Sequence, residues 1–200
     1  MNWNNHEVTM GSGLVAVGYF LFHLFFGLLI SLLWLRILLR YFRISALNPV
    51  SQLLHKFSQP MLKPITGLFP VKTLISRYDW PAIIVLIAIE IIKFALINIL
   101  FLGMALPLLW ILIYVLADLI IQPCNLLFYA ILAYAIMSWV NPMWKHPLAD
   151  ILYRITQPAL SIGRRIIPNI SGFDFSPIVI MIILKVIVLF IQASLPLPLI

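Results

Sequence analysis

The sequence predicts an all-α integral membrane protein whose four transmembrane helices form two tandem helix–loop–helix repeats. Of its 200 residues, 64% are hydrophobic and 10% are charged, whereas soluble domains are typically about 45–50% apolar and about 25% charged. Four continuous apolar stretches are long enough to cross a bilayer, which takes about 20 helical residues. The loops within the two halves also share one spacing of prolines.

The predicted transmembrane helices cover residues 14–41, 81–102, 112–140 and 177–195. Transmembrane β-strands would instead alternate in polarity over segments of about 10 residues. The first apolar stretch is longer than the core of a signal peptide, and no Lys or Arg precedes it. The predicted organisation is a polar tail (1–13), a first repeat (14–102), a connector (103–111), a second repeat (112–195) and a C-terminal tail (196–200).

One alternative divides the third apolar stretch at Gln122-Pro123 and gives five helices. Both halves would then be short, and the two basic loops would lie on opposite sides of the membrane. Four helices are therefore favoured. We expect Pro123 to interrupt the third helix, either as a plain kink or as the broken helix of a transporter binding site.

The internal repeat is defined by prolines in the two loops, the second set 98 positions after the first. They are Pro49, Pro60, Pro70, Pro147, Pro158 and Pro168. Each loop also carries apolar residues at i, i+3, i+4 and i+7, which is one face of a helix. These are Val50, Leu53, Leu54 and Phe57, then Leu148, Ile151, Leu152 and Ile155.

Each apolar stripe predicts an amphipathic helix on the membrane surface, with its basic side chains toward the headgroups. Asn48 before Pro49 suits a helix start, because proline at the first turn loses no hydrogen bond. We expect Gln59-Pro60 and Gln157-Pro158 to end these helices, because proline disfavours helical geometry in the preceding residue. Asp79 and Asp174 precede the second and fourth spans and suit their N-termini.

The charges predict the orientation. Basic residues concentrate at the two loops: Arg40, Arg43, Lys56, Lys63, Lys72, Arg77, Lys145, Arg154, Arg164 and Arg165. The connector and both tails contain no Lys or Arg. The positive-inside rule then predicts cytoplasmic loops and external termini.

Several short motifs in the second repeat resemble the YggT family, also called YlmG. They are AIMSWV (135–140), His146-Pro147, Thr156-Gln157-Pro158, RRIIP (164–168) and GFDFSP (172–177). The first repeat carries looser versions at 35–37, 48–49, 58–60 and 69–70, but has Asp79-Trp80-Pro81 before its second span. The resemblance covers about residues 14–195 and implies a multi-pass protein of the bacterial plasma (inner) membrane. The family has no agreed biochemical activity, and its members are linked to osmotic or potassium homeostasis, cell division, nucleoid or plastid organisation and cytochrome assembly.

Charged residues within the predicted spans form one candidate site. They are Glu90, Lys93, Asp118 and Lys185. Such residues are costly in lipid and usually face protein or water. They would either line an ion or proton path, or form packing ion pairs, Glu90 with Lys93 and Asp118 with Lys185.

Polar residues of the loops form a second candidate site for a protein partner or for anionic lipid. They are Gln59, Pro60, Gln157, Pro158, Arg164, Arg165 and Asp174. Basic residues near an anionic membrane surface each add roughly 1 kcal/mol of attraction. The same residues also serve to set topology.

Enzymatic and cofactor chemistry is not expected. Cys124 is the only cysteine, which excludes an internal disulfide and a cysteine metal cluster. The four histidines are scattered without metal-ligand spacing, and no nucleophile has a neighbouring His–acid pair. The basic residues lack interleaved aromatics, so no nucleic-acid partner is expected.

The leading hypothesis is a non-enzymatic membrane factor that organises or assembles envelope proteins; the alternative is an oligomeric ion channel or transporter component. Self-association is compatible with either.

Overall fold

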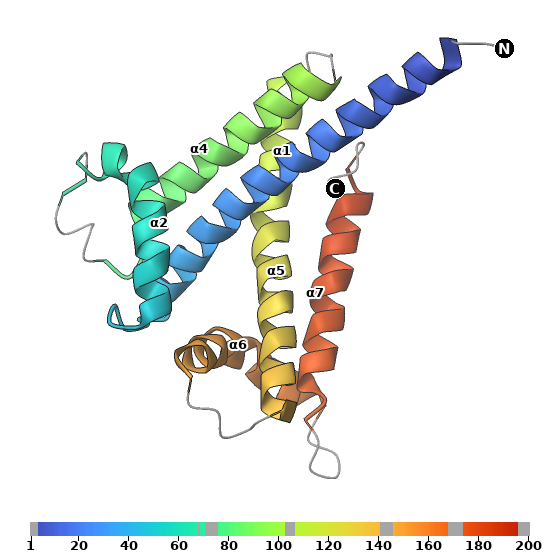
Figure 1. The fold of residues 1–200 in the computed structure, drawn as a ribbon. Helices are drawn as coiled ribbons and strands as arrows, with labels where there is room; N and C mark the ends of the chain where they lie inside the picture. Colours follow the sequence, from blue (N-terminus) through green and yellow to red (C-terminus); the bar gives the residue numbers. More distant parts are fainter. Residues whose placement is uncertain are drawn as a thin grey trace.

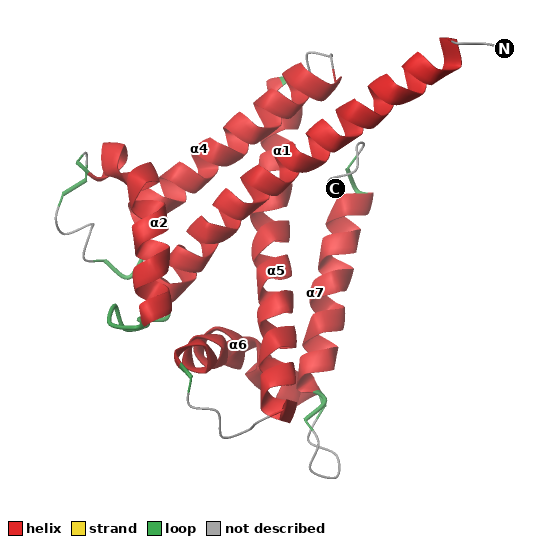
Figure 2. Ribbon diagram, in the orientation of Figure 1, coloured by secondary structure: helices red, strands yellow, loops and turns green. Residues whose placement is uncertain are grey.

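The computed structural model describes residues 4–67, 69–70, 76–102, 107–140, 146–167 and 174–195, and these ranges contain helices and no strands (Figure 2). The segments are α1 (Asn4–Tyr41), α2 (Pro49–Thr66), α4 (Trp80–Ile97), the π-helical η1 (Asn98–Leu102), α5 (Leu108–Val140), α6 (Pro147–Ile166) and α7 (Ser176–Ala193). The stretches long and apolar enough to cross a membrane are Gly13–Tyr41, Trp80–Phe101, Leu108–Ser138 and Ser176–Ala193. The prediction of four transmembrane helices in an all-α protein is confirmed.

The helices form two units of three (Figure 1). In the first unit α1 lies beside α4, and the shorter α2 packs against both. In the second unit α5 lies beside α7, and α6 packs against both. Contacts of α4 with α5, and of α2 with α6, join the units. The short helices α2 and α6 therefore lie at the same end of the molecule, which we call the α2/α6 end.

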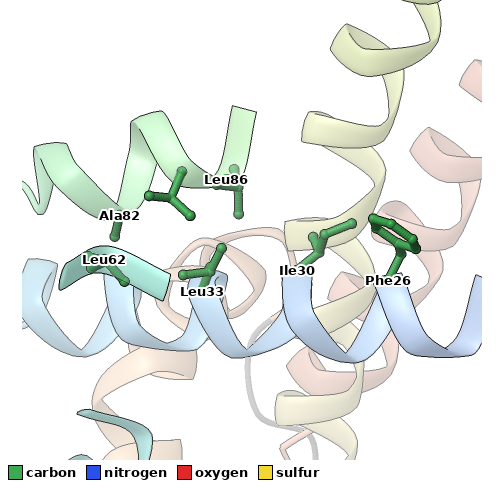
Figure 3. Packing of buried hydrophobic residues seen from close by; sticks show 7 residues of the cluster. Phe26, Ile30, Leu33, Leu62, Ala82 and Leu86 are labelled. Atoms are coloured by element: carbon green, nitrogen blue, oxygen red, sulfur yellow. The ribbon is translucent and has the colours of Figure 1, made fainter. Parts of the chain in front are cut away.

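The two units have equivalent hydrophobic cores. In the first, side chains from three helices point toward one another (Figure 3): Leu33, Leu62, Ala82 and Leu86, each at most 2% exposed. In the second, the core contains Ile131, Leu160, Ile180 and Leu184. Each of these residues stands 98 positions after its counterpart. The repeat in sequence is thus a repeat in packing.

The loop helices begin as their sequence indicates. The Asn48 side-chain oxygen accepts a hydrogen bond from the Val50 amide at 3.0 Å, immediately before Pro49. His146 has the same role for α6, where its Nδ1 accepts from the Leu148 amide at 3.2 Å. The Asn48 cap was predicted and is confirmed. These bonds satisfy amides that have no partner within the helix.

The predicted ends of the loop helices are wrong. Both α2 and α6 continue through Pro60 and Pro158 to the ends given above. A proline inside a helix leaves the carbonyl four residues earlier without its hydrogen bond. Those carbonyls belong to Lys56 and Arg154, which are exposed, so water or headgroups can satisfy them. Each loop therefore contains one helix that is longer than expected.

The third span is also continuous. The helix α5 runs from Leu108 to Val140 with Pro123 inside it. The five-helix alternative and a broken helix at Gln122-Pro123 are therefore excluded, whereas a plain kink at Pro123 stays a prediction. Apolar sequence on both sides and packing against α4, α6 and α7 keep the helix intact, since tertiary contacts routinely override local propensity.

Candidate functional site

A triad of charged side chains lies buried between α4 and α5. Glu90, Lys93 and Asp118 are 0%, 1% and 4% exposed. The Lys93 ammonium lies 2.6 Å from Glu90 Oε2, and it donates a hydrogen bond to Asp118 Oδ2. The predicted Glu90–Lys93 pair is confirmed. Counted as ionised groups, two carboxylates and one ammonium give the triad one net negative charge.

The triad belongs to both repeats and is not itself repeated. Glu90 and Lys93 come from the first unit and Asp118 from the second. The residues 98 positions away from them are Phe20, Val188 and Ile191. All three are apolar. Val188 is buried like its counterpart Glu90, so the position is buried in both units but charged only in the first. The ion pairs therefore fasten one unit to the other at a place where the duplicated sequence diverged.

Further polar side chains lie near the triad on α1. The rings of Tyr19 and His23 lie 5.5 Å apart, and His23 interacts electrostatically with Lys93 and Asp118. His23 Nε2 is buried and has no hydrogen-bond partner among the described residues. Within the same ranges no group of three or more His, Cys, Asp or Glu side chains is arranged to hold a metal ion. The cluster is thus a charged, hydrogen-bonding region inside an apolar bundle.

Lys185 does not join the triad, and the predicted Asp118–Lys185 pair is wrong. Lys185 is exposed on α7, where its ammonium lies 5.5 Å from the Phe128 ring centre. The α5 face toward α7 carries Ala117, which packs with Val188. Asp118 lies about 100° further around the helix, toward α4 and Lys93. Two consecutive residues of α5 thus contact different helices, Ala117 contacting α7 and Asp118 contacting α4.

A second charge cluster links the three helices of the first unit, α1, α2 and α4, at the α2/α6 end of the molecule. Arg36 on α1 lies 2.9 Å from the Asp79 carboxylate and donates a hydrogen bond to the Ser58 hydroxyl at 2.8 Å. Arg40 is 3.4 Å from the same carboxylate. Asp79 also accepts a hydrogen bond from the Ala82 amide at 3.4 Å and caps α4. Asp79 therefore joins the end of α1 to the start of α4, and Arg36 extends the cluster to the middle of α2.

Sequence reasoning missed this cluster. Arg36 figured only as part of a family motif, Arg40 only as a topology charge, and Asp79 only as a helix cap. A usable signal was present, because Arg36 and Arg40 are four residues apart and share one helix face. Asp79 lies immediately before the next span, at the same membrane boundary as the two arginines.

The second unit uses a different pair. Arg164 near the end of α6 lies 2.9 Å from the Asp174 carboxylate, which also accepts bonds from the amide and the hydroxyl of Ser176. Partial burial alone would raise the pKa of Asp174, but the bonds from Ser176 and Arg164 outweigh it and lower the pKa below its usual value. The pair therefore holds the start of α7 against α6.

The other predicted loop residues do not come together. Gln59 and Pro60 are exposed on α2, whereas Pro158 and Arg165 are exposed on α6. Gln157 is half-buried, and its side-chain oxygen has no partner among the described residues. Only Arg164 and Asp174 of this predicted set contact each other. The loop residues thus form separate surfaces rather than one site.

Comparison with known proteins gives one consistent family. The CCB3/YggT family model matches twice, at residues 15–100 and 109–195. The chain is 31% identical to the uncharacterized protein YggT of Escherichia coli K12 over 78% of each chain. It is 30% identical to an uncharacterized Haemophilus influenzae protein over 80% of this chain and 86% of that one. No solved structure matches. The two matched segments each contain one three-helix unit, and the chain belongs to the CCB3/YggT family.

Proposed function

We propose that this chain is a non-enzymatic membrane protein that organises or assembles other proteins of the cell envelope. The observation that carries the proposal is Lys185, a charged side chain on the outer surface of a membrane-spanning helix. We infer that it meets a carboxylate within the membrane helix of another protein. The expected partner is therefore a membrane protein with an acidic residue at mid-membrane depth.

The position of Lys185 makes exposure to lipid costly. At 1.5 Å per residue it lies about 12–14 Å from either end of α7, too deep for easy extension of the side chain to the surface. A lysine at the centre of a membrane helix costs about 2.5–3.5 kcal/mol or more. Contact with an acidic partner helix would offset that cost.

Among the acidic side chains that the structure describes, none is left unpaired for Lys185. These five are each already in an ion pair with another basic group: Asp79, Glu90, Asp118, Asp150 and Asp174. A second copy would present the same occupied acids. This supports a partner of a different sequence.

The test is purification of the protein and its bound neighbours from native membranes in a mild detergent. Lys185→Met should lose a membrane protein that wild type retains, while Lys185→Arg, which keeps the charge, should retain it. Equal recovery with Met, Arg and wild type would contradict the proposal. Thermal melting of the three purified proteins controls for folding.

We further propose that the α2/α6 end faces the cytoplasm of a bacterial inner membrane, with α2 and α6 as amphipathic helices in its interface. The support is the concentration of Lys and Arg at this end, as in the positive-inside rule. The test replaces Cys124 by alanine and introduces a cysteine at Gln59, which is exposed. A membrane-impermeant thiol reagent should label this cysteine in inverted vesicles but not in intact cells.

The buried triad favours a second candidate, a component that handles protons or monovalent cations. Its single net negative charge would be neutralised by one such ion in an apolar region. The test measures potassium and proton flux in proteoliposomes with wild type and with the Lys93→Met, Lys185→Met double variant. Flux that the double variant abolishes would favour transport over assembly. Flux no higher than in empty liposomes would favour the assembly proposal over transport.

A further inference from the structure

The apolar stripes of the two loop helices face each other across a cavity of about 520 Å³. Val50 and Leu53 of α2 lie on one side, and Leu148 and Leu152 of α6 on the other. Residues of α1 and α5, including Tyr129, complete the lining, which is almost wholly apolar. The volume is within the range of about 300–1,000 Å³ for small-molecule sites. Such a lining is suited to hydrocarbon.

A polar cavity of about 370 Å³ adjoins the apolar one, and Leu39 lines both. Its polar lining consists of Arg40, Arg43, Ser51 and His55. Ser51 is 2% exposed, and its hydroxyl has no hydrogen-bond partner among the described residues. A buried hydroxyl without a partner is costly. The polar cavity thus presents a donor that a bound group would satisfy.

The charge around this cavity is positive. Arg40 and Arg43 line it, and Arg40 shares the one carboxylate of Asp79 with Arg36. Burial first, and then the charge of Arg36, lowers the pKa of His55 below its usual value. An anion in the cavity would relieve this excess of positive charge.

Arg43 is held in an unusual backbone conformation. Its φ is 51°, in the left-handed region that favours glycine. The amide of Ile44 donates to the Leu39 carbonyl, and the Arg43 amide donates to the Arg40 carbonyl. This is the helix ending in which glycine is the usual residue at the left-handed position. An arginine there points to a role for its side chain, and its guanidinium forms no ion pair within the described ranges.

We propose that these adjoining cavities bind one anionic phospholipid, with its phosphate against Arg43, Ser51 and His55 and an acyl chain between α2 and α6. The guanidinium and the Ser51 hydroxyl would donate hydrogen bonds to phosphate oxygens. The polar cavity lies where α1 ends, and the apolar cavity reaches α5. This order, from charged to apolar, matches a lipid from headgroup to tail. The inference does not depend on the assembly function.

Arg43→Gly is the decisive variant, because it removes the charge while suiting the left-handed backbone. The full chain in detergent is titrated with phosphatidylglycerol, with phosphatidylcholine of the same acyl chains, and with inorganic phosphate, and bound lipid is counted by native mass spectrometry. Wild type should bind one phosphatidylglycerol more tightly than phosphatidylcholine. Arg43→Gly should bind it about tenfold to hundredfold more weakly, as expected for loss of a hydrogen bond between charged groups.

Two further variants test the parts of the site separately. Ala130→Phe places a bulky ring in the apolar cavity, which Ala130 lines, and should also weaken phosphatidylglycerol binding. Lys63→Gln removes a charge from α2 outside both cavities and should leave binding unchanged. Equal binding of both lipids, unchanged binding by Arg43→Gly or Ala130→Phe, or phosphate binding as tight as lipid would each overturn the proposal. Melting temperatures of all variants in the same detergent exclude misfolding as the cause.

Discussion

Replacing Lys93 by methionine should destabilise the protein more than any other single charge removal in the membrane region. Lys93 is 1% exposed and is the common partner of Glu90 and Asp118. Removing one partner of a buried ion pair costs about 3–5 kcal/mol. Here two buried carboxylates would lose their counterion together, so we expect the upper part of that range. Glu90→Gln should cost less, because Lys93 and Asp118 remain paired.

The assay is unfolding of the purified protein in one detergent or nanodisc, followed by circular dichroism. Lys185→Met serves as the matched control, since it removes the same charge from an exposed position and should not destabilise the isolated chain. The triple variant Glu90→Leu, Lys93→Met, Asp118→Leu should recover most of the stability, because well-packed apolar side chains commonly replace buried ion pairs without loss. A Lys93→Met protein as stable as the Lys185→Met control would refute the structural role of the triad.

Three smaller effects follow from other contacts. Gly163→Ala should destabilise by about 1–3 kcal/mol in the same assay, because the new methyl group would lie 2.8 Å from the Ser176 Cβ; Gly67→Ala, with open space around it, should change little. Arg36→Met should cost about 1.5–3 kcal/mol through loss of charged hydrogen bonds, and an unchanged melting temperature would disprove the role of that cluster. The lowered pKa of Asp174 means that its pairing stabilises the protein above the unfolded carboxyl pKa of about 3.9. That contribution should be lost as pH falls through the folded-state pKa, and wild type and Asp174→Asn should become more alike in stability on acidification.

The apolar pattern predicted the architecture well, because lipid imposes one simple rule on it. A span must be a continuous apolar helix of sufficient length, so the positions and the number of the spans could be predicted from the sequence. The 98-residue offset, found from prolines, also relates the core residues Leu62 and Leu160. The ends of α2 and α6 could not be predicted from the sequence. A proline weakens a helix, but the contacts with neighbouring helices decide whether the helix ends there. Pro60, Pro123 and Pro158 all lie inside helices.

The polar contacts were harder to predict because partners depend on helix rotation. Glu90 and Lys93 are three residues apart on one helix, and that pair was found. Asp118 was assigned to the wrong lysine, because nothing in one sequence fixes which face of α5 meets α4. Arg36 and Asp79 are 43 residues apart and meet only because α1 and α4 are antiparallel neighbours in the fold. Local spacing reveals local pairs, whereas distant pairs require the packing.

The two units share their apolar cores but differ in every charge cluster, and this difference has a physical explanation. Core positions must be filled in both copies, so duplication preserves them as equivalents. A buried charge is costly unless it is paired, so each one requires a specific partner that the other copy need not supply. Glu90 corresponds by position to buried Val188, and Lys185 corresponds to the apolar Ile87. Specialised functions of this protein should therefore be sought where the copies differ: at the triad that joins them, at the Arg43 cavity, and at the outward face of α7.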